Sequence, residues 1–176
     1  VSFLEDCAVE LKDLAEYTDK LTAIFHRNGV KGTWYAHASV GCLHVRPVLN
    51  MKQVGGAETM RAIAEEAFEL VRSFGGSHSG EHGDGIVRSE FNDRMFGPVL
   101  PDLFRQVKAM FDPQGMFNPG KITDAPKMDD RELFRFAPGY EVEDFDSVLD
   151  WAAWPGAAGG FQGAVEMCNN NGACRK

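Results

Sequence analysis

The 176-residue chain is long enough for one domain with a hydrophobic core, and its 44% hydrophobic and 25% charged residues are ordinary values for a globular protein. A net charge of −8 argues against nucleic acid as a partner. The sequence contains no apolar run long enough to span a membrane, and its first residues lack the pattern of a signal peptide. We therefore expect a cytoplasmic protein, and the four unevenly spread cysteines agree with a reducing compartment.

The hydrophobic pattern predicts helices and strands in a mixed order. Residues 1–9 have the composition of an extended segment, and apolar residues then recur at intervals of three and four, which predicts a helix over 11–27. Strands are predicted at 33–36 and 42–49, and further helices at 57–74 and 98–111. The last helix is expected to bury a stripe formed by Leu100, Leu103, Phe104, Val107 and Phe111. This order predicts an α+β fold with helices covering an antiparallel sheet.

A glycine-rich stretch between residues 75 and 85 reads Gly-Gly-Ser-His-Ser-Gly-Glu-His-Gly-Asp-Gly. Such a backbone can adopt positive φ and pass close to a ligand, at a cost in folding entropy that an ordinary surface loop has no need to bear. We interpret this stretch as a functional site, with Glu81 and His82 inside it.

Two further histidines, His37 and His44, lie in and beside the predicted strands. In one unbroken strand they would point to opposite faces, because an odd number of positions separates them. A turn or bulge at Gly41 is therefore expected if both rings are to meet. Together with Glu81 they form the ligand set of a catalytic divalent metal, zinc or a transition metal such as iron or manganese. Ordinary hydrogen bonding of these histidines is the alternative interpretation.

Three motifs occur in the order found in the FAD-linked oxidases that act on D-2-hydroxy acids, and they resemble the motifs of that family. They are the pair His37 and His44, Gly80-Glu-His-Gly83, and Phe111-Asp-Pro-Gln-Gly-Met-Phe-Asn-Pro-Gly-Lys121. The family belongs to the flavoproteins of the vanillyl-alcohol-oxidase type. It includes D-lactate dehydrogenases, the flavin subunit of glycolate oxidase and D-2-hydroxyglutarate dehydrogenases. The resemblance covers residues 1–122 and implies part of the C-terminal domain of such an oxidase.

The resemblance also implies roles for individual residues. His37, His44 and Glu81 would hold the metal, and His82 would be the general base that takes the hydroxyl proton. Asn118 would contact FAD, which a separate N-terminal domain would mainly hold, so that the chain alone should bind FAD weakly or not at all.

Other roles follow from the chemistry of the residues. A substrate carboxylate requires a guanidinium, and Arg46 and Arg88 are the candidates, although either could equally be a surface arginine. For His82, a hydrogen bond to a carbonyl of the glycine loop is the alternative to a role as base.

The rest of the chain is predicted to be less regular. Residues 123–165 have the composition of an acidic linker containing Pro and Gly, either simply solvated or serving as a docking surface. Residues 166–176 resemble the start of a fused iron–sulfur domain, with Cys168 and Cys174 as candidate ligands of a 4Fe–4S cluster. Two thiolates cannot complete such a cluster, so further cysteines would have to follow Lys176.

These observations predict the substrate- and metal-binding part of an FAD-dependent D-2-hydroxy acid dehydrogenase of the D-2-hydroxyglutarate or D-lactate type. Its partners would be a small 2-hydroxy acid and the flavin and iron–sulfur domains of the parent chain, and an electron-transfer partner could hold it at the inner membrane. Because no side chain accepts a hydride, the chain should fold but be inactive alone. The alternatives are a self-contained His/His/Glu metal hydrolase and a noncatalytic docking module.

Overall fold

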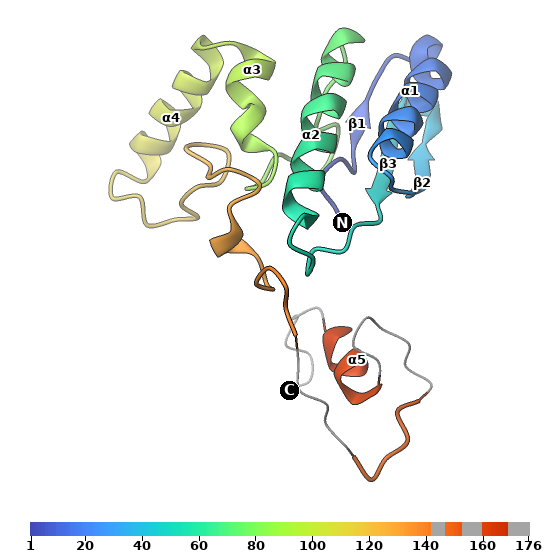
Figure 1. Cartoon of the computed structure of the whole chain (residues 1–176). Coiled ribbons are helices and arrows are strands. Elements are labelled where there is room, and N and C mark those ends of the chain that lie inside the picture. The colour runs from blue at the N-terminus through green and yellow to red at the C-terminus, as the bar shows by residue number, and fades with distance from the viewer. Residues whose placement is uncertain (142–146, 153–159, 169–176) are drawn as a thin grey trace. The chain divides into compact units, whose positions relative to one another are not determined.

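The computed structural model describes residues 1–141, 147–152 and 160–168. It divides the chain into two compact units, Val1–Pro138 and Gly139–Lys176 (Figure 1). The first unit contains a three-stranded antiparallel sheet with helices packed against it, so the predicted α+β fold is confirmed.

The sheet has the order β1-β3-β2, with β3 (Cys42–Pro47) between the short β1 (Cys7–Ala8) and β2 (Gly32–His37). The two longer strands form a hairpin closed by a 3₁₀ turn, η2 (Ala38–Val40), and by Gly41, whose φ of 71° lies in the left-handed region. The bend predicted at Gly41 is therefore confirmed. In the resulting register Tyr35 lies opposite His44, and His37 opposite Cys42, which puts both histidines on one face of the sheet.

The other face of the sheet packs against two helices, α1 (Leu14–Arg27) and α2 (Gly56–Ser73), which lie side by side in Figure 1. Both agree with the predicted helices to within a few residues, and a 3₁₀ turn, η1 (Leu11–Asp13), precedes the first. Their apolar stripes and the core-facing residues of β3 form the core. It includes Tyr17, Leu21 and Phe25 from α1, Ile63, Ala67 and Val71 from α2, and Leu43 and Val45 from β3.

The next elements are a 3₁₀ turn, η3 (Ser89–Phe91), and two helices, α3 (Asn92–Phe96) and α4 (Val99–Phe111). The ring of Phe91 stacks on Phe68 of α2, with 4.8 Å between the ring centroids, and Arg94 forms ion pairs with Glu65 and Glu69 of the same helix. These contacts attach η3 and α3 to the core.

Helix α4 forms where it is predicted, but the prediction that its apolar stripe is buried is wrong. Leu100, Leu103, Val107 and Phe111 are all exposed, and Phe111 keeps 81% of its surface. Of the residues in this helix, only Pro101 is buried. The periodicity of apolar residues predicts that a helix has an apolar face, but it does not predict whether another element packs against that face.

Part of the predicted linker belongs to the first compact unit. Met128 is buried in the core, and Arg131, at the start of η4 (Arg131–Leu133), donates hydrogen bonds to the carbonyl oxygens of Met51 and Val54. The second unit contains a short helix, α5 (Gly160–Glu166). Among the helices that the structure describes, none is both long and apolar enough to cross a membrane.

Candidate metal and substrate site

The glycine loop lies along the free edge of β1 and continues the sheet irregularly. Ala8 and Ser77 exchange two main-chain hydrogen bonds of 2.9 Å, and the Gly80 N–H donates to the carbonyl oxygen of Asp6 at 2.7 Å. A Cβ atom on Gly76 would lie 2.4 Å from the Ala8 oxygen, and one on Gly80 would lie 2.9 Å from the Asp6 oxygen. The sequence predicts that this loop passes close to a ligand, whereas the close approach of Gly76 and Gly80 is to the chain's own main chain.

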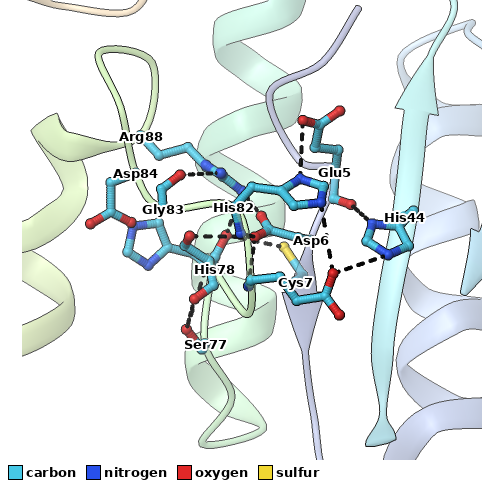
Figure 2. Close-up of polar contacts among 12 residues, drawn as sticks. Glu5, Asp6, Cys7, His44, Ser77, His78, His82, Gly83, Asp84 and Arg88 are labelled. Carbon is cyan, nitrogen blue, oxygen red and sulfur yellow. Dashed lines mark hydrogen bonds and ion pairs between the residues drawn. The ribbon is translucent and has the colours of Figure 1, made fainter. Parts of the chain in front are cut away.

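A buried carboxylate holds the functional end of this loop. Oδ2 of Asp6 accepts hydrogen bonds from the main-chain N–H groups of Glu81 at 2.9 Å and His82 at 2.6 Å. Its other oxygen forms an ion pair with Arg88, and the side chain of Asp6 has no exposed surface. Because two adjacent N–H groups bind the same oxygen, the backbone that carries Glu81 and His82 is fixed against β1 (Figure 2).

The hairpin and the loop together place three potential metal ligands around one point. Nε2 of His37 lies 3.6 Å from Oε1 of Glu81, and Nε2 of His44 lies 3.5 Å from Oε2 of the same carboxylate. The three ligand atoms lie within 4.8 Å of one another. His44 is buried, whereas His37 and Glu81 are accessible, so the group is open to solvent on one side. Two imidazoles and a carboxylate with an open side fit a catalytic divalent cation.

The tautomer of His44 suits this purpose. Its Nδ1 lies 2.8 Å from the main-chain oxygen of Glu5, and a carbonyl oxygen can only accept a hydrogen bond. Nδ1 therefore carries the proton, and the lone pair of Nε2 faces Glu81. A hydrogen bond from the second ring nitrogen to a carbonyl or carboxylate is the usual support of a metal-binding histidine.

The ring of His82 stacks on that of His44, with 5.1 Å between centroids and 14° between planes. Its Nδ1 lies 3.2 Å from Oε1 of Glu5, and its Nε2 lies 3.7 Å from Oε2 of Glu81. Partial burial acts to raise the pKa of Glu5, but hydrogen bonds from Ser2 and His82 and the charge of Arg46 together hold that pKa below its usual value. Glu5 is thus a carboxylate at neutral pH, and it can only accept from His82.

The two candidate arginines lie in different environments. Arg46 is on the same face as His44, about half exposed, with its Nε 3.4 Å from Oε2 of Glu5 and its guanidinium 5.5 Å from the centroid of the Tyr35 ring. None of the described residues pairs with its two terminal nitrogens. Arg88 is buried, which lowers its pKa, and besides Asp6 its guanidinium contacts the carbonyl oxygen of Gly83 at 2.5 Å. Arg46 therefore lies half exposed beside Glu5 and Tyr35, whereas Arg88 is buried against the loop.

The remaining predicted site residues lie away from this group of contacts. Asn118 has a φ of 47° in an exposed turn, where its Oδ1 accepts a hydrogen bond from Nζ of Lys121 at 3.4 Å. Cys168 is an exposed free cysteine in the second unit, and Cys174 lies outside the described residues.

Comparison with known proteins identifies the family of this domain. Residues 1–122 match the family described as FAD linked oxidases, C-terminal domain. The chain belongs to this family. It is 36% identical to a D-2-hydroxyglutarate dehydrogenase of Pseudomonas putida over 98% of its own length, and 34% identical to one of Escherichia coli over 99%. It is 31% identical over 69% of its length to a D-lactate dehydrogenase of Archaeoglobus fulgidus. The chain spans 16% of the length of the first two relatives and 26% of the third.

Sequence reasoning missed Glu5 and Asp6 of this FAD-linked oxidase domain. Both lie in the segment Phe3-Leu4-Glu5-Asp6-Cys7, where Phe3, Leu4 and Cys7 are buried. Two adjacent acids within an apolar extended segment were the available signal, because a carboxylate is seldom placed beside core residues unless it has a partner.

Proposed function

We propose that this chain is the substrate- and metal-binding part of an FAD-dependent dehydrogenase of D-2-hydroxy acids, with D-2-hydroxyglutarate as its substrate and D-lactate as the next candidate. The observation that carries the proposal is the convergence of His37, His44 and Glu81 on one point, with Nε2 of His82 at 3.7 Å from that carboxylate. The names of the relatives that match nearly the whole chain support the choice of D-2-hydroxyglutarate.

Substrate binding is assigned to Arg46. Its planar guanidinium can bind both oxygens of a carboxylate, and the contacts with Glu5 and Tyr35 hold it on the face that carries His44. Because His44 and Arg46 are two positions apart on β3, their side chains project from the same side of the sheet. A 2-hydroxy acid bound there would have its carboxylate at the arginine and its hydroxyl toward the metal ligands.

Proton removal is assigned to His82. When bound, a divalent cation held by His37, His44 and Glu81 supplies an electrophile that acidifies the hydroxyl, and FAD supplies the hydride acceptor. Nε2 of His82 takes the hydroxyl proton while the α-hydrogen leaves as a hydride, so the substrate loses two electrons and becomes a 2-oxo acid. The stacking of His82 on the buried ring of His44 holds the base beside the ligands.

The flavin is assigned to another domain of the parent protein, with Asn118 of the exposed turn as a contact. We also propose that the oxidase domain ends at residue 122 and that the linker ends at residue 165. Cys168 and Cys174 would then be ligands of a 4Fe–4S cluster. The parent protein would then pass electrons from the flavin to an iron–sulfur domain.

The proposal is tested by assaying the parent protein, with its flavin domain, against D-2-hydroxyglutarate, D-lactate and their L-enantiomers, with an artificial electron acceptor. Turnover of a D-2-hydroxy acid is expected, and Arg46→Ala is expected to raise KM for it by about tenfold or more, since a charge-assisted hydrogen bond contributes roughly 1.5–3 kcal/mol. Exposed Arg72, whose side chain forms an ion pair with Glu69 of its own helix, provides the matched control as Arg72→Ala.

The 176-residue chain is assayed beside the parent. It should bind Zn²⁺ but oxidise no hydroxy acid, with or without added FAD. Flavin-independent hydrolysis of an ester or amide by this chain would replace the proposal with a self-contained metal hydrolase. Absence of Zn²⁺ binding by both proteins would favour a noncatalytic module.

A further inference from the structure

We infer that a single residue, Glu5, sets the tautomers of both functional histidines: its main-chain oxygen fixes His44 as a metal ligand, and its side-chain carboxylate fixes His82 as a base. Figure 2 shows Glu5 reaching each ring with a different oxygen. Glu5 is thus a positioning residue, because it acts through the side chains that it contacts, which are the two histidine rings and Arg46. The role of His82 as base rests on the proposed function, whereas the assignment of the tautomers does not.

The main-chain contact concerns His44. The 2.8 Å separation of Nδ1 from the Glu5 carbonyl oxygen requires a proton on Nδ1, so that Nε2 keeps its lone pair. This nitrogen points at Glu81, 3.5 Å away. No substitution of the Glu5 side chain removes a main-chain carbonyl group, so this half of the arrangement should survive such a change.

The side-chain contact concerns His82. The ionised carboxylate accepts at 3.2 Å from Nδ1, so this ring also carries its proton on Nδ1 and exposes the lone pair of Nε2. Nε2 lies 3.7 Å from Glu81, on the side where the ligand atoms meet. If the proton were instead on Nε2, the ring could not accept a proton at that position. Removing the Glu5 carboxylate should therefore change the tautomer of His82 and leave that of His44 unchanged.

The neighbours of Glu5 hold it in place for both contacts. Asp6, the next residue, binds the loop N–H groups and Arg88, and Cys7 begins the paired strand β1. The second carboxylate oxygen of Glu5 lies 3.4 Å from Nε of Arg46, which limits the rotation of the side chain. The main chain and the side chain of Glu5 are therefore both fixed.

The test is long-range ¹H–¹⁵N NMR of the metal-free 176-residue chain with ¹⁵N-labelled histidine, at a pH where the rings are neutral. Signals are assigned with His44→Gln and His82→Gln. In the unmodified chain both rings should be Nδ1–H tautomers. In Glu5→Ala the His82 signals should move toward the Nε2–H pattern, while those of His44 stay unchanged. Glu10→Ala, which removes an exposed carboxylate that pairs with Lys12, is the control and should change neither ring.

Several results would overturn the inference. One is an Nε2–H tautomer of either ring in the unmodified chain, which requires no variant to fold. Another is a Glu5→Ala spectrum in which His82 is unchanged, or in which both rings change together. None of these outcomes depends on turnover. The inference can therefore fail while the proposed dehydrogenase activity stands, and the activity can be absent while the tautomers are as inferred.

A second readout separates positioning from general support of the fold. In the parent protein, Glu5→Ala should lower kcat about 10- to 100-fold, the range typical of residues that support a functional histidine, with the bound metal unchanged. Parallel loss of metal and kcat would show instead that the side chain of Glu5 supports the whole site.

Discussion

Asp6 and Arg88 form an ion pair beneath the loop that carries Glu81 and His82, and the carboxylate of this pair is completely shielded from water. The same carboxylate accepts the N–H groups of both loop residues. The pair therefore connects the interior of the domain to the two residues on which the proposed chemistry depends.

Asp6→Ala should destabilise the domain and weaken metal binding together. The substitution leaves the guanidinium of Arg88 buried without its charge partner, and breaking a buried pair in this way typically costs about 3–5 kcal/mol. Urea unfolding and Zn²⁺ titration measure the two effects. Glu10→Ala, at an exposed ion pair, should leave the free energy of unfolding nearly unchanged. Normal Zn²⁺ affinity in a folded Asp6→Ala protein would contradict the positioning role of Asp6.

Gly76→Ala should displace the loop from β1. The new Cβ would lie 2.4 Å from a main-chain oxygen of Ala8, an atom that cannot move aside without moving the strand. Overpacking of this kind usually costs about 1–3 kcal/mol, and because Glu81 follows in the same loop, metal affinity should fall as well. Gly55→Ala is the matched control. A Cβ there meets no atom within 4 Å, so its cost should stay below about 1 kcal/mol. Equal stabilities of the two variants would refute the steric argument.

The convergence of His37 and His44 could be predicted because it depends on local information. The odd spacing of the two residues and the glycine between them require a bend if the rings are to meet, and the hairpin supplies it. Helices α1 and α2 were predictable for a similar reason, since the periodicity of each lies within one segment of the sequence.

The contacts of Glu5 and Asp6 could not be predicted in the same way. Asp6 binds residues about 75 positions away, and nothing in a single sequence pairs an acid with an N–H group or an arginine at that distance. Its two neighbours contact different groups: Glu5 contacts the ring of His82, and Cys7 contacts the main-chain oxygen of His78. Such pairings depend on how the strand and the loop are placed by the whole fold.

Asp112 should make stability depend on pH in the acidic range. The ion pair with Lys108, and then the N–H groups of Phe117 and Met116, lower the pKa of Asp112 from 3.8 to about 2. A lowered carboxyl pKa stabilises the folded state above the unfolded pKa, and that stabilisation is lost as pH falls through the folded one. The free energy of unfolding of the unmodified chain should therefore exceed that of Asp112→Asn above about pH 4, and this difference should shrink between about pH 4 and pH 2. Unfolding curves of both proteins across this range measure the difference, and a constant difference would contradict the assignment.

His44→Ala and His82→Ala should separate metal binding from proton transfer in the parent protein. Removing His44 takes away the buried imidazole of the proposed ligand set, so both metal content and turnover should be lost. Removing His82 leaves His37, His44 and Glu81 in place, so metal content should persist while turnover falls by about 10² to 10⁴, the usual contribution of a general base. Metal analysis and steady-state kinetics on the same preparations give both quantities.

His26→Ala is the matched control for this pair of variants. His26 lies in the last turn of α1, where it is exposed, and it does not belong to the proposed ligand group. Its loss should therefore leave both metal content and turnover unchanged. Equal loss of metal from the His44 and His82 variants would mean that His82 is itself a ligand. Its Nε2 would then have to turn from the position 3.7 Å from Glu81 into direct coordination, and the base would have to be sought elsewhere in the site.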